Sequence, residues 1–169
     1  MVLTKAELIG SLKDEVRILL HIASKVDLQQ LDYRPTAKQR STLELLQYLT
    51  IVGPIHLGTI ASGTFSMDAW RDRWRSQEKI ADARDLEQAK QEIGSLAKMF
   101  EEVVGGLSDA DLRAPMQMFG QTASRGLWIV RLVLNHYTAY RMQLFLYLKA
   151  SGREELNTMN LWVGMDAPN

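Results

Sequence analysis

The longest periodic apolar stretch in the sequence runs from Leu127 to Ser151 and reads LWIVRLVLNHYTAYRMQLFLYLKAS. Its apolar residues recur at the three- and four-residue spacing of an α-helix. They cover nearly the whole circumference of that helix, which is typical of a helix buried on all sides. We therefore expect this segment to be the central helix of an all-α bundle. It contains His136, which either binds a metal or packs in the core.

Three other segments show the same helical periodicity, and no alternating run is strong enough to predict a strand. Thr4 with Glu7, and Ser41 with Glu44, match the capping box in which two side chains satisfy backbone N–H groups at a helix start. These starts and the apolar spacing predict helices over residues 5–26, 41–61 and 85–104.

Glycine and proline mark the expected breaks. Gly53-Pro54 should bend or interrupt the second helix, because proline lacks the N–H donor and crowds the preceding turn. Gly105-Gly106 should end the third helix, since glycine adopts the left-handed conformation without a Cβ penalty. A loop through Pro115 then leads to the last helix, which we expect to begin near Thr122.

The second and third helices are joined by a long polar crossover over residues 62–84. Such a length suits two parallel helices, between which the chain must return along the bundle. The crossover holds Trp70 and Trp74 among arginines and aspartates, and we interpret the tryptophans as anchors on the bundle. The tail after Gly152 contains Trp162 and should also dock. No linker divides the chain, so we predict one domain over residues 1–169.

Composition excludes several classes of function. Twenty basic and twenty acidic residues give a net charge of zero, so nothing attracts the whole protein to nucleic acid or an anionic membrane. There are no cysteines, which excludes disulfides, thiolate nucleophiles and cysteine-ligated metals. The charged N-terminal segment does not resemble a signal peptide, and no unbroken apolar run approaches the ~20 residues of a membrane span. We expect a cytoplasmic protein.

Two helices carry the residues that could form a site. On the last helix, one narrow arc holds Ile129, Leu132, His136, Tyr140, Gln143 and Tyr147. On the second helix, a comparable arc holds Glu44, Tyr48, Val52 and Ile55. If the arcs face each other, Tyr48, His136 and Tyr140 meet inside the bundle, where cofactor and metal sites are commonly built.

These stretches resemble the DinB/YfiT superfamily. The matching motifs are Glu44-Leu-Leu-Gln-Tyr48-Leu, Leu107-Ser-Asp-Ala-Asp-Leu112, His136-Tyr-Thr-Ala-Tyr140-Arg-Met-Gln143-Leu and Asn160-Leu-Trp-Val-Gly164. The resemblance spans nearly the whole chain. It implies an up-down-down-up four-helix bundle, often a homodimer, in which one histidine of the second helix and two of the fourth bind a divalent metal. Some members are thiol-dependent transferases or isomerases.

The sequence departs from the family at two of its three ligand positions, where Tyr48 and Tyr140 replace histidine. A phenol with a pKa of ~10 must lose its proton before it binds Zn²⁺ or Ni²⁺ well, so His136 alone remains as a metal ligand. His56 lies two turns beyond Tyr48 and about 80° round the helix, and we do not expect it to restore the site. The prediction is therefore a degenerate metal site with no cofactor.

The three residues then form either a buried hydrogen-bonded cluster or a pocket for a small molecule without metal. Glu44 and Gln143 border the pocket, although Glu44 also serves as the capping partner of Ser41. The alternative is a working metal-dependent, thiol-dependent S-transferase or isomerase with His136 as a ligand. Arg141 should point to a surface ion pair. Because the last helix is apolar on nearly all sides, we predict a homodimer.

Overall fold

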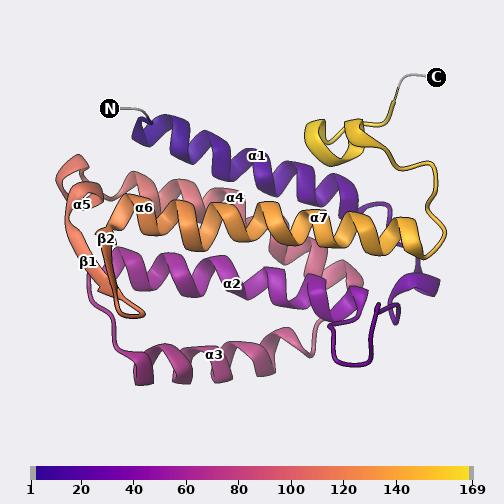
Figure 1. Cartoon of the computed structure of the whole chain (residues 1–169), viewed down its shortest axis with the longest axis horizontal. Helices are drawn as coiled ribbons and strands as arrows, with labels where there is room; N and C mark the ends of the chain where they lie inside the picture. The colour runs from indigo at the N-terminus through magenta and orange to yellow at the C-terminus, as the bar shows by residue number, and fades with distance from the viewer. Residues whose placement is uncertain (1–2, 168–169) are drawn as a thin grey trace.

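Four long helices form a bundle in the computed structural model, which describes residues 3–167. Figure 1 shows that the first and last of them run in one direction and the two middle ones in the other. This is the predicted up-down-down-up order, and the predicted all-α bundle is confirmed. The bundle helices are α1 (Lys5–Ala23), α2 (Thr42–Ser62), α4 (Leu86–Gly105) and α7 (Asn135–Ala150).

The predicted helix starts are confirmed. Thr4 and Glu7 form the capping box of α1, and Ser41 and Glu44 form that of α2. α4 ends at Gly105, but Gly106 has a φ of −70°. The predicted left-handed glycine is therefore wrong. This helix instead ends with right-handed geometry, and the Gly106 N–H donates to carbonyls of the last turn.

α2 continues through Gly53 and Pro54 to Ser62 as one helix, so the predicted interruption is wrong. Most of the helix is buried. Pro54 has no N–H to donate to the carbonyl oxygen of Thr50, four residues before it. Tyr137 of the last helix packs against this part of α2, and its hydroxyl donates to the Leu49 carbonyl oxygen over 2.9 Å. Tertiary packing therefore outweighs the local preference of this segment.

The unbroken α2 is, among residues 3–167, the one helix long and apolar enough to cross a membrane by length and composition alone. The expectation that no run in the sequence approaches the length of a membrane span is therefore wrong for α2. In the bundle, 67% of the most apolar window of α2 is buried against other helices. A core helix passes the same test of length and composition, and α2 has the burial of a core helix.

The crossover between α2 and α4 is itself a helix, α3 (Met67–Ala81), where the sequence predicts only a polar connection. α3 lies outside the bundle along α2, as Figure 1 shows at the lower edge. Trp70 and Trp74 pack on Ile51 and Ile55 of α2. The predicted anchoring role of the two tryptophans is confirmed.

The segment between α4 and the last helix holds a short β-hairpin where the sequence predicts a loop. Its four-residue strands pair antiparallel, with Pro115 opposite Ser124 and Met118 opposite Gln121. Strands this short leave too little alternation to detect. The elements of this segment are α5 (Asp109–Arg113), β1 (Pro115–Met118) and β2 (Gln121–Ser124).

The last helix begins at Arg125, three residues after the predicted start. It runs through α6 (Arg125–Ile129), a π-helical turn η2 (Val130–Leu134) and α7. The buried Arg125 side chain donates to the Ile60 and Ala61 carbonyl oxygens at the end of α2, over 2.9 and 2.6 Å. It therefore caps α2 from another helix, in addition to the Gly63 N–H, which donates to the Ile60 carbonyl oxygen over 3.1 Å.

The centre of the bundle is occupied by Tyr137 and Arg141 of α7, one residue beyond the predicted His136 arc. Arg141 is 2% exposed and forms an ion pair with Glu15 of α1 at 3.0 Å. The predicted surface ion pair of Arg141 is therefore wrong. Its guanidinium also donates to the Leu161 carbonyl oxygen. The Glu15 carboxylate and this carbonyl together hold the Arg141 cation in the core.

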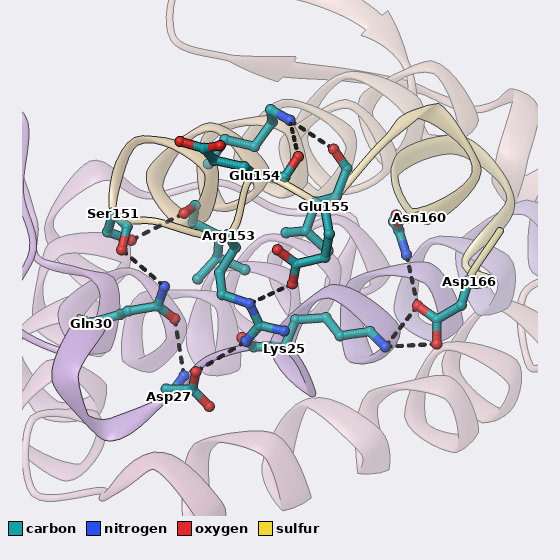
Figure 2. A network of polar contacts seen from close by, with 12 residues as sticks. Lys25, Asp27, Gln30, Ser151, Arg153, Glu154, Glu155, Asn160 and Asp166 are labelled. Atoms are coloured by element: carbon teal, nitrogen blue, oxygen red, sulfur yellow. Dashed lines mark hydrogen bonds and ion pairs between the residues drawn. The ribbon is translucent and has the colours of Figure 1, made fainter. Parts of the chain in front are cut away.

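The tail docks on the bundle, as predicted, through the buried Leu161 rather than through Trp162, which is 56% exposed. It contains the π-helical turn η3 (Met159–Val163), and a 3₁₀ turn, η1 (Leu28–Gln30), follows α1. Figure 2 shows the polar contacts that hold the tail. Lys25, just after the end of α1, contacts Asp166 at 2.7 Å, and Asn160 donates to the same carboxylate over 2.9 Å.

The apolar faces of α7 that suggested a second protomer are largely covered within one chain. Phe145 and Leu148 are buried, and Leu134 is half-buried. Leu146 remains exposed on the same helix. The homodimer stays a prediction.

Candidate functional site

A cluster of six aromatic side chains lies between α2, α3 and α7. Tyr48 and His56 come from α2, eight residues and about 80° apart round the helix, and both contact aromatic side chains of α3 and α7. Trp70 and Trp74 come from α3, one turn apart, and cover the cluster from outside. We call this group the aromatic cluster. Its six members are Tyr48, His56, Trp70, Trp74, His136 and Tyr140.

The structure brings together the three predicted residues Tyr48, His136 and Tyr140. The rings of Tyr48 and Tyr140 pack edge to face with centroids 5.1 Å apart, and His136 stacks on Tyr140 at 5.8 Å. Burial, together with the neighbouring Tyr140 hydroxyl, raises the pKa of Tyr48. The Tyr48 phenol is therefore protonated at neutral pH and is a poor ligand for a cation.

The imidazole of His136 lies just after the π-helical turn η2. Such turns widen the helix by one residue and are frequent at functional sites. Burial lowers the pKa of His136, while the backbone carbonyls of Arg131 and Leu132 beside its ring oppose that effect. His136 is half-buried at the edge of the bundle, not at its centre.

His56 joins the aromatic cluster, which its position on α2 relative to Tyr48 did not predict. Its ring centroid is 5.2 Å from that of His136. α2 and α7 run in opposite directions. His56 comes after Tyr48 on α2 and His136 comes before Tyr140 on α7, so both histidines lie toward the same end of the cluster. Burial, and then the neighbouring His136, lower the pKa of His56 to about 4. Both imidazoles are thus neutral at pH 7.

Glu44 and Gln143, also predicted as pocket residues, do not reach the histidines. Glu44 accepts the Ser41 N–H over 2.7 Å as the capping partner and pairs with Arg34 at 3.3 Å. Gln143 donates to the Tyr147 hydroxyl over 2.6 Å, one turn further along α7. The capping role of Glu44 is confirmed.

A cleft of about 440 Å³ opens beside Tyr48, between the start of α2 and the end of α3. We call it the Tyr48 cleft. The Arg40 guanidinium lies 4.0 Å above the Tyr48 ring at its mouth. Both signs of charge line it, so it suits a polar molecule. Its charged and polar lining includes Asp32, Arg34, Arg40, Glu44, Gln47, Glu78 and Asp82.

The residues present do not fit the divalent metal that the family resemblance implies. Within residues 3–167, no three histidine, aspartate or glutamate side chains gather as they would around a metal ion. His56 and His136 supply two imidazoles, and the other nearby oxygens are the phenols of Tyr48 and Tyr140. A structural or catalytic zinc takes at least three nitrogen, sulfur or carboxylate ligands, so the set is incomplete.

Sequence reasoning missed His56, Trp70 and Trp74 as members of the site. One signal was available for the tryptophans, because their four-residue spacing puts both on one face of a helix. Nothing local indicated His56, since its place depends on how α2 and α7 lie against each other.

No known family model matches this sequence, and no curated protein matches it either. The structure is similar to the crystal structure of a DinB-like protein (YjoA) from Bacillus subtilis, with a TM-score of 0.68. The match covers 89% of this chain and 95% of that chain, at 14% sequence identity. An identity this low shows the fold alone. The chain has the fold of the DinB-like proteins.

Proposed function

We propose that this chain is a member of the DinB/YfiT superfamily that binds a small molecule at the aromatic cluster without a divalent metal. The observation that carries the proposal is the pairing of Tyr48 with Tyr140 at 5.1 Å beside His136. Two phenols stand where the resemblance places two histidine ligands. They favour a ligand that is recognised by ring contacts and hydrogen bonds.

The surroundings of the aromatic cluster support binding of a small molecule. The Tyr48 cleft has the size of a small-molecule site and leads to the Tyr48 ring. Trp74 stacks on Tyr48 with the two rings 14° from parallel and their centroids 5.7 Å apart. A molecule in the cleft would therefore meet the aromatic cluster at its floor.

The second candidate is a metal-dependent, thiol-dependent S-transferase or isomerase. One observation favours it: His56 approaches His136, so two imidazoles are present instead of one. The donor set is still one strong ligand short.

Metal content separates the two candidates. The protein is dialysed against Zn²⁺, Ni²⁺ or Mn²⁺, then against buffer, and its metal is measured together with its melting temperature with and without chelator. We expect less than stoichiometric metal and no effect of chelator. His21→Ala is the matched control, because His21 lies outside the aromatic cluster and contacts Asn160 of the tail. Stoichiometric metal that is lost in His136→Ala and retained in His21→Ala would overturn the proposal.

A further inference from the structure

Three buried nitrogen atoms beneath α3 have no hydrogen-bond partner in the described part of the chain. They are Nδ1 of His56 and the indole Nε1 atoms of Trp70 and Trp74. The His56 side chain is 5% exposed. Buried polar groups are nearly always hydrogen-bonded, so three such atoms in one place require an explanation.

The three rings pack against one another in pairs. The centroids of Trp70 and Trp74 are 5.6 Å apart, and His56 lies 6.0 Å from Trp70 and 5.9 Å from Trp74. This triangle is called the indole–imidazole subsite below. It touches the predicted site on both sides, through Tyr48 on Trp74 and His136 on His56.

The other tryptophan that is buried shows the contrast. The indole N–H of Trp128 donates to the Met116 carbonyl oxygen over 2.9 Å. The tryptophan in the bundle core therefore has its N–H satisfied. Trp70 and Trp74 do not, although both are fixed in a helix.

The chemistry of the indole–imidazole subsite selects a class of ligand. An indole can only donate, so the ligand must carry acceptor atoms. No carboxylate contributes to the pKa of His56, and burial keeps its imidazole neutral, so a cation would find no counter-charge. The walls are aromatic faces and edges, which stack on flat rings. A planar, uncharged heteroaromatic ring meets all three requirements.

The hairpin holds α3 over this subsite. Phe119, at the tip of the hairpin, packs on Trp70 with centroids 5.5 Å apart and on Phe65 at 4.9 Å. Phe119 has a φ of 50° and Gly120 a φ of 76°, the pattern of a type I′ turn. A bulky residue with positive φ is strained, and asparagine is the residue that this position prefers.

The contacts of Phe119 with α3 therefore offset its backbone strain. They lie at the surface, since Phe119 is 41% exposed. A second cleft, of about 290 Å³, lies at the same end of α3 and has Trp70 in its wall. Opening of α3 at this end would lead from the cleft to the subsite.

We propose that His56, Trp70 and Trp74 form a subsite beneath α3 that binds a planar heteroaromatic ring by donating indole hydrogen bonds to its acceptor atoms, and that α3 opens at its Phe119 end to admit the ring. The inference rests on the proposed small-molecule function and names the class of molecule.

Isoquinoline and naphthalene test the subsite. Both are planar bicyclic molecules of the same shape, but only isoquinoline has a ring nitrogen that accepts a hydrogen bond. The four indole N–H groups of the full-length, ¹⁵N-labelled protein are followed by NMR at pH 7.5. The signals are assigned with Trp70→Phe and Trp74→Phe, which keep a ring and remove the donor.

We expect isoquinoline to shift the Trp70 and Trp74 signals and to leave Trp128 and the exposed Trp162 in place. Naphthalene should bind roughly threefold to tenfold more weakly, which is the effect of one neutral hydrogen bond. In Trp70→Phe and Trp74→Phe this preference should shrink. Equal binding of both probes, no shift by either, or a long-lived water on the two indoles that isoquinoline does not displace would each overturn the inference.

The opening of α3 is tested with Phe119→Asn, and Phe119→Tyr serves as the control that keeps the ring. Asparagine relieves the turn but removes the contacts with Phe65 and Trp70. Exchange of the Trp70 and Trp74 indole protons with solvent should be roughly twofold to tenfold faster in Phe119→Asn, and unchanged in Phe119→Tyr. An unchanged rate in Phe119→Asn would overturn the opening of α3.

Metal is measured on the same samples, so the two proposals can fail separately. Stoichiometric metal with shifted indole signals would overturn the metal-free function and leave the indole–imidazole subsite. Metal-free protein with unshifted signals would overturn the subsite and leave the proposed function.

Discussion

The imidazole rings of His56 and His136 lie with their centroids 5.2 Å apart, one from α2 and one from α7. His56 is the more deeply buried of the two, and its pKa is lowered from 6.5 to about 4. A histidine with a lowered pKa binds its proton more readily in the unfolded chain than in the folded protein. Acid therefore destabilises the fold through this residue.

The first prediction follows from that sign. Above the unfolded pKa of 6.5, His56 does not lower the free energy of unfolding. As the pH drops below 6.5 the free energy of unfolding falls, and this loss levels off below about 4. One unit of pKa corresponds to about 1.4 kcal/mol, so the total is on the order of 3 kcal/mol. Urea unfolding of the wild type and of His56→Leu at pH 7.5, 5.5 and 4.5 measures it. The variant should lose less stability on acidification, and an identical loss would contradict the assignment.

The place of His56 shows where prediction from sequence stops. The capping boxes at Thr4 and Ser41 and the apolar spacing of α1, α2 and α4 are local, and they predicted these helices well. His56 meets His136 only because of the relative position of two helices, which no local pattern contains. The Arg141–Glu15 pair was not predicted for the same reason, since an arginine on an apolar helix does not indicate a partner on α1.

Two other elements were missed for local reasons. α3 buries one narrow face, and seven of its 15 residues are charged, so its sequence resembles a connection. The hairpin has strands of only four residues, with Met116 and Met118 as its buried positions. Of the candidate site, Tyr48, His136 and Tyr140 were predicted to meet and do so. The tryptophans that cover them depend on the path of the crossover.

A second prediction concerns the contact of Gly53 with Tyr137. A Cβ at residue 53 would lie 2.5 Å from the Tyr137 hydroxyl oxygen and 2.8 Å from Cζ of Phe100. Gly53→Ala should therefore destabilise the protein by about 1–3 kcal/mol through overpacking. Gly10→Ala is the control, because a Cβ there meets nothing within 4 Å and α1 should gain about 0.5–1 kcal/mol. Thermal unfolding of the two variants measures both changes in stability. Equal changes in Gly53→Ala and Gly10→Ala would refute the packing argument.

A third prediction concerns Arg125, which caps α2 from the start of α6. Arg125→Met should leave the Ile60 and Ala61 carbonyl oxygens without this donor and cost about 2–4 kcal/mol. Arg131→Met, an exposed arginine on the same long helix, should change stability by less than about 0.5 kcal/mol. Hydrogen exchange should locate the loss at the end of α2. Protection there that matches the wild type would show that the cap is dispensable.

The last prediction concerns the buried pair of Arg141 and Glu15, which are 3.0 Å apart. Arg141→Met should cost about 3–5 kcal/mol, because it leaves a carboxylate in a site where burial already raises its pKa. It should also expose the tail to protease, since Arg141 holds the Leu161 carbonyl. Lys13→Met, which breaks an exposed pair with Glu101, should cost less than about 1 kcal/mol.

A second substitution separates the buried charge from the lost contact with the tail. Adding Glu15→Gln to Arg141→Met removes the uncompensated charge and should recover part of the lost stability. The tail should stay sensitive to protease in the double variant, because its own contact with Arg141 is still missing. Urea unfolding and limited proteolysis measure the two effects separately. If the double variant is no more stable than Arg141→Met, the cost does not come from the isolated Glu15 charge.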